Sequence, residues 1–303
     1  MAANNREMLD VAIIGSGPAA FTAALYVARE NSSATVYERE SIGGLAGTIS
    51  NIENYPGFTG TGMELMGKMR EQAESFGAKT EYGECTAVKK LKKHFELMID
   101  DTSVLAKTVL VATGSERRKL GIPGEDLPGI SYCATCDAPM TTGKEVLVVG
   151  GGNTAAQEAF HLLKYCVSVK LLVRSGLRCN DVLKDRLKKE PRIEVITGVV
   201  PTEIERKEGQ LYVNTEKSGV FVADNLFIFV GAGPATKFLP AEILAEDGSV
   251  KTRQNMETEI DGLFAAGDCR LGSVKQAVVA AGEGAAAARG MSKYLEELRH
   301  TGA

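Results

Sequence analysis

The sequence predicts an α/β chain built from two similar units, in each of which a buried strand runs through a glycine-rich turn into a helix. The first copy of this pattern lies at residues 10–30 and the second at residues 146–164. A cysteine pair, Cys133 and Cys136, is followed directly by Asp137 and stands just before the second copy. Two such patterns in a chain of 303 residues favour two domains of ordinary size.

The composition is that of a globular protein with a large core, since 44% of the residues are hydrophobic and the net charge is −4. A mildly acidic chain lacks the excess of positive charge that attracts nucleic acid or an anionic membrane. Residues 1–7 contain no apolar stretch of the kind found in secretory signals. The most apolar tract, residues 277–288, contains Gly282-Glu283-Gly284 and is too short to span a bilayer. We therefore expect a cytoplasmic protein with no nucleic-acid or membrane partner.

The first unit begins with a β-branched apolar run at residues 10–14, which is typical of a buried parallel strand. The GxGxxA turn that follows suits a bound pyrophosphate. Gly15 permits the tight turn, Gly17 lets a phosphate approach the backbone, and the small Ala20 allows close helix–strand packing. The helix expected at residues 21–30 would direct its positive end toward the phosphate charge.

A second strand, expected at residues 34–37, ends at Glu38. An acid about 20 residues after the glycines suits the two hydroxyls of a ribose. The strand, turn, helix and acid together predict that the first unit binds a dinucleotide. The segment at residues 43–58 is rich in glycine and proline, and we expect loops there.

The hydrophobic pattern of the remaining chain predicts further strands and helices, because the two have different periods. Helices are expected at residues 63–76, 156–164, 182–189 and 275–289, an antiparallel meander at 80–106, and strands at 108–113, 146–149, 168–173, 220–230 and 260–266.

The second glycine-rich turn repeats the GxGxxA spacing with Gly150, Gly152 and Ala155. The strand after it ends in Arg174 rather than in an acid, and Arg178 follows four residues later. An arginine at this position can bind the 2′-phosphate of NADP. Alternatively, both arginines are solvated surface charges.

The cysteine pair is a compact redox device. Cys133 and Cys136 are close enough to form a disulfide, and Asp137 beside them can move a proton as the bond opens and closes. Zinc binding by the pair is disfavoured, since zinc takes four ligands and the sequence has no second such pair, so no metal site is expected. The other cysteines are scattered and are expected to be small buried hydrophobes: Cys85, Cys166, Cys179 and Cys269.

These motifs, in this order, resemble the low-molecular-weight thioredoxin reductases over nearly the whole chain. The CATCD string is the most specific of them, because it directly precedes the second glycine-rich turn. The segments that carry the resemblance are residues 15–20, 54–57, 112–114, 133–137, 150–155, 265–268 and 276–278.

The resemblance implies two Rossmann-like three-layer (ββα) dinucleotide-binding domains, the second inserted into the first. Residues 1–115 and 246–303 would form an FAD-binding domain, and residues 116–245 a pyridine-nucleotide-type domain that carries the cysteine pair. It also implies a homodimer, and a rotation of one domain against the other during turnover. Electrons would pass from NADPH through FAD and the dithiol to thioredoxin.

The same resemblance implies roles for individual residues. Cys136 would face the flavin, Cys133 would attack the thioredoxin disulfide, and Asp137 would be the acid. FAD would be bound by Gly15, Gly17, Pro18, Ala19, Ala20, Glu38, Arg39, Gly44, Thr48, Asn54, Ala112, Thr113, Gly114, Gly267, Asp268, Lys275, Gln276 and Ala277. The nucleotide donor would be bound by Gly150, Gly152, Asn153, Thr154, Ala155, Arg174 and Arg178.

The chain departs from the family at the 2′-phosphate motif. The family commonly has His-Arg-Arg and a further arginine a few residues later, whereas residues 173–175 read Val-Arg-Ser and Arg178 is slightly displaced. NADPH is therefore the expected donor, and reduced ferredoxin or another donor is the alternative. A further alternative is a flavin dithiol oxidase, which passes electrons from a small dithiol to oxygen.

Overall fold

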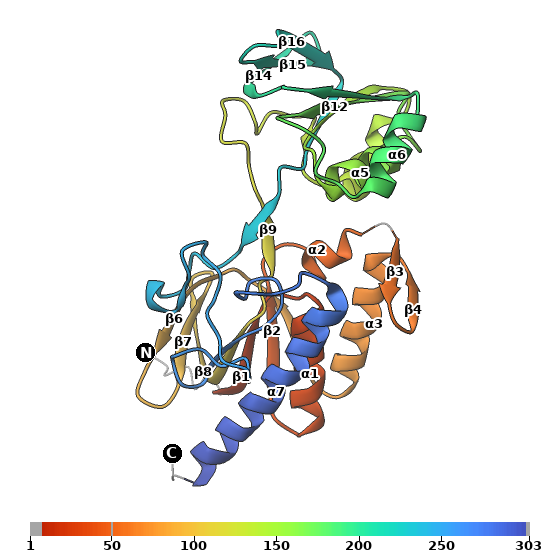
Figure 1. Cartoon of the computed structure of the whole chain (residues 1–303). Coiled ribbons are helices and arrows are strands. Elements are labelled where there is room, and N and C mark those ends of the chain that lie inside the picture. Colours follow the sequence, from red (N-terminus) through yellow and green to blue (C-terminus); the bar gives the residue numbers. More distant parts are fainter. Residues whose placement is uncertain (1–7, 50, 301–303) are drawn as a thin grey trace. The chain divides into compact units, whose positions relative to one another are not determined.

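The computed structural model describes residues 8–49 and 51–300, so the expectation about residues 1–7 lies outside the described range. The chain divides into two compact units. Unit 1 comprises Met1–Glu116 and Gly233–Ala303, and unit 2 comprises Arg117–Ala232. Unit 2 is thus inserted into the sequence of unit 1. The chain passes from one unit to the other at strands β9 (Ser115–Arg117) and β18 (Ala232–Pro234), which pair as a two-stranded sheet (Figure 1).

Unit 1 is built on a seven-stranded sheet with the order β5-β2-β1-β8-β7-β6, in which β19 also pairs with β8. The strands on the β5 side of β8, together with β19, are parallel, and β7 and β6 continue the sheet in antiparallel fashion. The strands are β1 (Leu9–Ile14), β2 (Ala34–Glu38), β5 (Lys79–Tyr82), β6 (Cys85–Lys90), β7 (Phe95–Ile99), β8 (Thr102–Val111) and β19 (Leu263–Ala265).

Successive residues of β1 alternate between two cores. Val11 and Ile13 pack with the helices α1 (Pro18–Arg29), α3 (Gly62–Ser75) and α7 (Ala277–His300). Ala12 and Ile14 pack in a second cluster with residues of β7, β8 and the short 3₁₀ helix η2 (Ala241–Ile243). The period of two along a strand therefore fills both sides of the sheet. Leu239 and Ile243 also belong to this second cluster of unit 1. Unit 2 ends at Ala232, whereas the sequence analysis expected the second domain to extend to residue 245.

Helices α1 and α7 pack closely because small residues line their contact. A Cβ atom added at Gly284 would lie 2.2 Å from the Ala19 carbonyl oxygen, so only glycine fits there. Helix α3 begins at a capping box, in which the Thr61 hydroxyl accepts from the Glu64 N–H and the Glu64 carboxylate accepts from the Thr61 N–H.

Two expectations about unit 1 were wrong. Residues 43–58 are not loops throughout, because they contain α2 (Gly44–Gly47) and β3 (Ile52–Tyr55), which forms a hairpin with β4 (Phe58–Gly60). Gly57, at φ +83°, supplies the turn of this hairpin. The antiparallel meander expected at 80–106 contains only β6, β7 and β8, because β5 pairs with β2 in parallel. Strand β8 also includes residues 108–111 of the separate strand predicted at 108–113.

Unit 2 is built on a five-stranded parallel sheet with the order β10-β17-β11-β12-β13. Its strands are β10 (Ile130–Ser131), β11 (Glu145–Val149), β12 (Ser168–Val173), β13 (Ile193–Thr197) and β17 (Asn225–Ile228). Helices α5 (Asn153–Leu162) and α6 (Asp181–Lys189) pack on one face, and a three-stranded antiparallel sheet packs on the other. That smaller sheet comprises β14 (Pro201–Lys207), β15 (Gln210–Thr215) and β16 (Val220–Ala223). Unit 2 therefore has three layers.

The strand predicted at residues 220–230 is in fact two strands that belong to different sheets. β16 pairs with β15, whereas β17 lies between β10 and β11. The chain changes sheet at Asp224, whose N–H donates to the Glu145 carbonyl at 3.2 Å. Two short apolar runs, separated by Asp224 and Asn225, therefore serve the two β layers of unit 2.

Candidate active site

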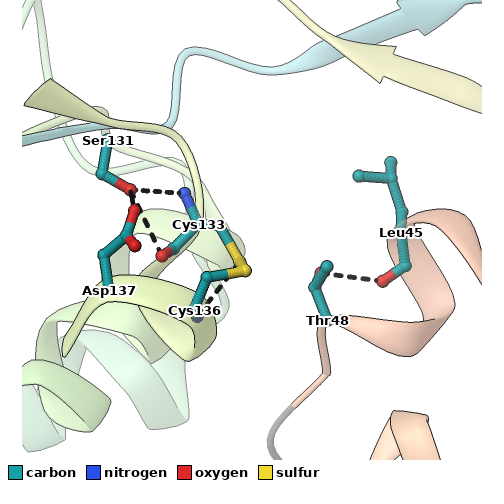
Figure 2. Close-up of a disulfide and its surroundings, with 6 residues drawn as sticks. All are labelled: Leu45, Thr48, Ser131, Cys133, Cys136 and Asp137. Carbon is teal, nitrogen blue, oxygen red and sulfur yellow. Dashed lines mark hydrogen bonds between the residues drawn. A yellow bond between two sulfur atoms is a disulfide. The ribbon is translucent and has the colours of Figure 1, made fainter. Parts of the chain in front are cut away.

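The cysteine pair forms a disulfide at the start of a short helix in unit 2. Cys133 and Cys136 are bonded, and their Cα atoms are 5.3 Å apart (Figure 2). Cys133 caps helix α4 (Ala134–Asp137), and its sulfur accepts the Cys136 N–H at 3.2 Å. A peptide N–H directed at this sulfur favours a thiolate on Cys133 once the bond is reduced. Helix α4 leads directly into the 3₁₀ helix η1 (Ala138–Thr141).

Asp137 lies beside the disulfide and is held by a serine that the sequence analysis did not single out. The Ser131 hydroxyl donates to Oδ2 of Asp137 at 2.6 Å (Figure 2). The same hydroxyl accepts the Cys133 N–H at 2.9 Å. One buried hydroxyl thus links the first cysteine to the acid. The only sequence signal is a serine two residues before the first cysteine.

In unit 1, the backbone of the first turn requires a glycine at position 15. Gly15 has φ +97°, and a Cβ atom added there would lie 2.4 Å from the Ala112 carbonyl oxygen. Its N–H donates to the Tyr37 carbonyl at 2.8 Å. Gly17 caps the N-terminus of α1, with open space where a Cβ atom would lie. The turn therefore has room for a phosphate at the helix N-terminus.

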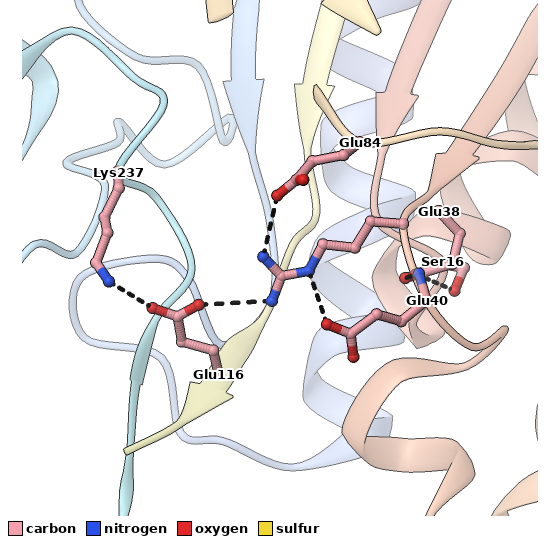
Figure 3. Close-up of polar contacts among 7 residues, drawn as sticks. Ser16, Glu38, Glu40, Glu84, Glu116 and Lys237 are labelled. Atoms are coloured by element: carbon pink, nitrogen blue, oxygen red, sulfur yellow. Dashed lines mark hydrogen bonds and ion pairs between the residues drawn. The ribbon is translucent and has the colours of Figure 1, made fainter. Parts of the chain in front are cut away.

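Glu38 is buried at the end of β2, and its carboxylate is fixed by two donors (Figure 3). The Ser16 hydroxyl donates to Oε2 at 2.5 Å, and the Glu40 N–H donates to Oε1 at 2.9 Å. Ser16 also accepts the Gly43 N–H at 2.9 Å. The sequence analysis missed Ser16, which occupies the variable position of the glycine motif and joins the first turn to both Glu38 and the next loop.

Arg39, expected to contact FAD, is surrounded by carboxylates. It forms ion pairs with Glu40 at 3.4 Å and with Glu84 and Glu116 at 3.5 Å each (Figure 3). Lys237 forms a further ion pair with Glu116 at 3.2 Å. A pocket of about 370 Å³ beside this network is lined by Arg39, Glu40, Tyr82, Gly83, Glu84 and Asp100.

Two predicted residues far apart in the sequence are in contact, since the Asn54 side-chain amide donates to the Gln276 side-chain oxygen at 2.9 Å.

The turn after β19 is held by a buried carboxylate. The Gly267 N–H donates to the buried Glu283 at 2.8 Å, and Glu283 forms an ion pair with Arg270. Burial raises the pKa of the neighbouring Asp268 carboxyl, as does the charge of Glu283.

Many of the predicted FAD residues of unit 1 follow the carboxyl ends of four parallel strands, β1, β2, β8 and β19. Since such ends meet at one edge of a sheet, they mark the usual ligand edge of an α/β fold. Gly15 and Gly17 follow β1, Glu38 ends β2 and Arg39 follows it, Ala112, Thr113 and Gly114 follow β8, and Gly267 and Asp268 follow β19. The others lie in or beside neighbouring elements: Pro18, Ala19 and Ala20 begin α1, Gly44 begins α2 and Thr48 follows it, Asn54 is in β3, and Lys275 and Gln276 precede α7, which begins at Ala277.

The second glycine turn, in unit 2, has the same backbone requirement. A Cβ atom added at Gly150 would lie 2.3 Å from the Phe229 carbonyl oxygen, and Gly152 caps α5. The Asn153 side-chain oxygen accepts the Asn180 N–H at 2.8 Å, so this residue secures the loop after β12. Thr154 lies in the exposed first turn of α5, and Ala155 is buried behind it.

Arg174 and Arg178 lie on the loop that Asn153 secures. The Arg178 N–H donates to the Gly151 carbonyl at 2.6 Å, which holds this loop against the glycine turn. Both side chains are exposed, and within residues 8–49 and 51–300 neither forms an ion pair. Two exposed arginines thus lie on a loop that is bonded to the glycine turn.

Residues 8–49 and 51–300 contain no group of three or more His, Cys, Asp or Glu residues placed to hold a metal ion. The same residues form no helix that is both long and apolar enough to cross a membrane.

The family model for pyridine nucleotide-disulphide oxidoreductases matches residues 9–284, and the chain belongs to that family. A thioredoxin reductase of Bacillus subtilis (strain 168) is 36% identical over 98% of this chain and 98% of its own length. The crystal structure of the Lactococcus lactis thioredoxin reductase is 36% identical, covers 95% of this chain and 99% of that one, and has a TM-score of 0.87. The resemblance to low-molecular-weight thioredoxin reductases and the predicted two-domain fold class are confirmed.

A more distant solved structure is that of a ferredoxin-flavin thioredoxin reductase from Clostridium acetobutylicum. It is 27% identical, covers 97% of this chain and 99% of that one, and has a TM-score of 0.56.

Proposed function

We propose that the chain is an FAD-dependent thioredoxin-disulfide reductase in which electrons pass from a reduced donor through FAD and the Cys133–Cys136 dithiol to thioredoxin. The observation that carries this proposal is the disulfide itself, bonded at the start of α4 with Asp137 hydrogen-bonded beside it. A second support is family membership together with the named relatives. The same likeness supports a homodimer that works in the cytoplasm.

Unit 1 fits FAD by the chemistry of its residues. The open space at Gly17 and the N-terminus of α1 suit a pyrophosphate, and the buried Glu38 carboxylate suits the hydroxyls of an adenosine ribose. Ser16 and the Glu40 N–H fix the orientation of that carboxylate, and each of its oxygens has a further lone pair that can accept a hydrogen bond from a ribose hydroxyl. FAD, when bound, would supply the two-electron chemistry that reduces the disulfide.

Cys133 and Cys136 divide the work on thioredoxin. The Cys133 thiolate attacks one sulfur of the thioredoxin disulfide, so that an intermolecular S–S bond forms and the other thioredoxin sulfur leaves as a thiolate. Cys136 then attacks Cys133, which restores the disulfide and releases the second thioredoxin thiolate. Asp137 exchanges protons with these sulfurs, so that two electrons and two protons reach thioredoxin in total.

The second unit supports NADPH as the donor, through the glycine turn at Gly150 and the exposed Arg174 and Arg178. Ferredoxin is the second candidate donor. It is favoured by Ser175 at a position where the family commonly has arginine, and by the likeness to the clostridial ferredoxin-flavin enzyme.

Cofactor release and turnover together test the proposed function. The purified protein should be yellow and should release FAD on denaturation. With thioredoxin and a reduced donor it should reduce the thioredoxin disulfide, and Cys133→Ser should abolish this turnover while retaining FAD. Release of FMN, or of no flavin after reconstitution, would contradict the cofactor. Oxygen uptake with a small dithiol and no donor would instead identify a dithiol oxidase.

A further inference from the structure

We propose that Ser131 is a positioning residue for Asp137, which it holds in place to exchange protons with the Cys133–Cys136 dithiol. This proposal rests on the proposed function and extends it to a residue outside the cysteine motif. It requires that the Ser131 hydroxyl bind Asp137, that the peptide of Cys133 be tied to the same hydroxyl, and that Ser131 itself be rigidly placed.

The single proton of the Ser131 hydroxyl goes to Asp137. The oxygen lies 2.6 Å from Oδ2 of Asp137 and 3.2 Å from the Cys133 carbonyl oxygen. Because a hydroxyl has one proton to donate, the shorter contact takes it. The lone pairs of the same oxygen accept the Cys133 N–H at 2.9 Å. The order of donation therefore runs from the Cys133 peptide to Ser131 and from Ser131 to Asp137.

Ser131 is anchored by the sheet of unit 2. Strand β10 pairs in parallel with β17, with Ile130 opposite Leu226 and Ser131 opposite Phe227. Ile130 and Tyr132 pack against the core between the two β layers. Because successive residues of a strand alternate, Ser131 faces the other side, where it meets α4. Ser131 is only 8% exposed, so its hydroxyl is shielded from competing water.

Asp137 needs such a support. It belongs to a helix of four residues, and its N–H donates to the Cys133 carbonyl at 3.1 Å. The hydroxyl of Ser131 fixes Oδ2, while Oδ1 has no hydrogen-bond partner among the residues that the structure describes. The free oxygen is thus the one that exchanges a proton with a leaving thiolate, and the held oxygen sets its direction.

Reduction of the Cys133–Cys136 disulfide by dithiothreitol tests the proposal without thioredoxin, nucleotide or flavin turnover. The holoprotein would be mixed with the reagent, quenched with an alkylating agent and analysed by mass spectrometry for the rate of reduction. The thiolate of dithiothreitol attacks one protein sulfur, and the departing protein thiolate takes a proton from Asp137. The variants are Ser131→Ala, Ser131→Thr, Asp137→Asn, and the double variant Ser131→Ala with Asp137→Asn.

Ser131→Ala should slow reduction about tenfold, as part of the ~10²–10⁴-fold that a positioned proton donor contributes. Ser131→Thr keeps the hydroxyl and should restore most of the rate. In the Asp137→Asn background, Ser131→Ala should cause little further loss, because the two residues act as one unit. Thr142→Ala is the matched control, since it removes an exposed hydroxyl bonded to the nearby Pro139 carbonyl and should leave the rate unchanged.

An equal loss from Ser131→Ala with and without Asp137 would overturn the proposal and show a purely structural role. An unchanged rate in Ser131→Ala would overturn it as well. Failure of the wild-type protein to reduce thioredoxin, with the coupled effects on dithiothreitol reduction intact, would reject the proposed function and leave the role of Ser131 standing.

Discussion

At the scale of single residues, the two cysteines differ in their surroundings. Cys133 is half-buried and its sulfur accepts a peptide N–H, whereas Cys136 is exposed and its sulfur has no such donor among the described residues. The N–H stabilises a thiolate on Cys133, which suits it to attack a substrate disulfide. The contrast therefore supports the division of labour implied by the family.

Cysteine variants test that division. Cys136→Ser should leave Cys133 able to form a stable mixed disulfide with a thioredoxin that lacks its resolving cysteine. Cys133→Ser should form none, because Cys136 would be reserved for the flavin. Non-reducing electrophoresis with mass spectrometry measures both outcomes. A mixed disulfide that forms only through Cys136 would reverse the assignment.

Ser16 is a second serine that holds a predicted acid in place, since its hydroxyl donates to Glu38, the acid expected to bind ribose. Ser16→Ala removes a charge-assisted donor from the buried Glu38 carboxylate, a loss worth about 1.5–3 kcal/mol. We expect weaker retention of FAD, measured as a raised dissociation constant by fluorescence titration of the apoprotein. Ser41→Ala, an exposed serine in the following loop, is the control and should bind FAD as the wild type does. Equal affinities in all three proteins would count against a role for Glu38 in FAD binding.

At the scale of elements, the packing of α1 on α7 depends on one glycine. Gly284→Ala would place a methyl group 2.2 Å from the Ala19 carbonyl oxygen, and the helices would have to separate. Overpacking of this kind typically costs about 1–3 kcal/mol in the free energy of unfolding. Chemical denaturation measures the change.

Gly282 provides a matched control two residues earlier in α7. A Cβ atom added at Gly282 meets nothing within 4 Å, so Gly282→Ala should be neutral or should stabilise by up to about 1 kcal/mol through higher helix propensity. Equal effects of the two substitutions would show that helix propensity, and not the close approach of α1, governs this helix.

The elements of unit 1 and unit 2 show where prediction from the sequence succeeded and where it failed. The glycine turns at Gly15 and Gly150 were predictable because the backbone leaves no room for a side chain there. The hairpin of β3 and β4 was missed, since its glycines and proline are equally typical of loops. The parallel pairing of β5 with β2 was missed because it joins segments far apart in sequence, which local periodicity cannot report.

At the scale of the whole molecule, the sequence predicts residues for the chemistry but not the residues that hold them in place. The cysteine pair, Asp137 and Glu38 stand in recognisable motifs, so their positions were predicted. Ser16 and Ser131 were not, because a short hydroxyl carries no pattern and its role depends on which acid the fold brings to it. The structure thus adds the residues that hold the predicted ones in place.

The identity of the electron donor also belongs to this scale, because it decides what unit 2 does besides carrying the dithiol. Arg174 and Arg178 are exposed beside the second glycine turn, while Ser175 offers no charge. Each charge-assisted hydrogen bond to a phosphate is worth about 1.5–3 kcal/mol, or about ten- to a hundredfold in affinity. We therefore expect weak use of NADPH, with a small preference over NADH.

Arg174→Ala should raise the KM for NADPH far more than the KM for NADH, because only NADPH carries the 2′-phosphate. Lys188→Ala, which removes an exposed cation from α6, is the control and should change neither KM. Anaerobic bleaching of the flavin measures the use of each donor. If neither nucleotide bleaches it at millimolar concentration, NADPH is excluded and reduced ferredoxin becomes the donor to test. Such a donor must have a potential near or below that of thioredoxin, about −270 mV, for electrons to flow toward thioredoxin.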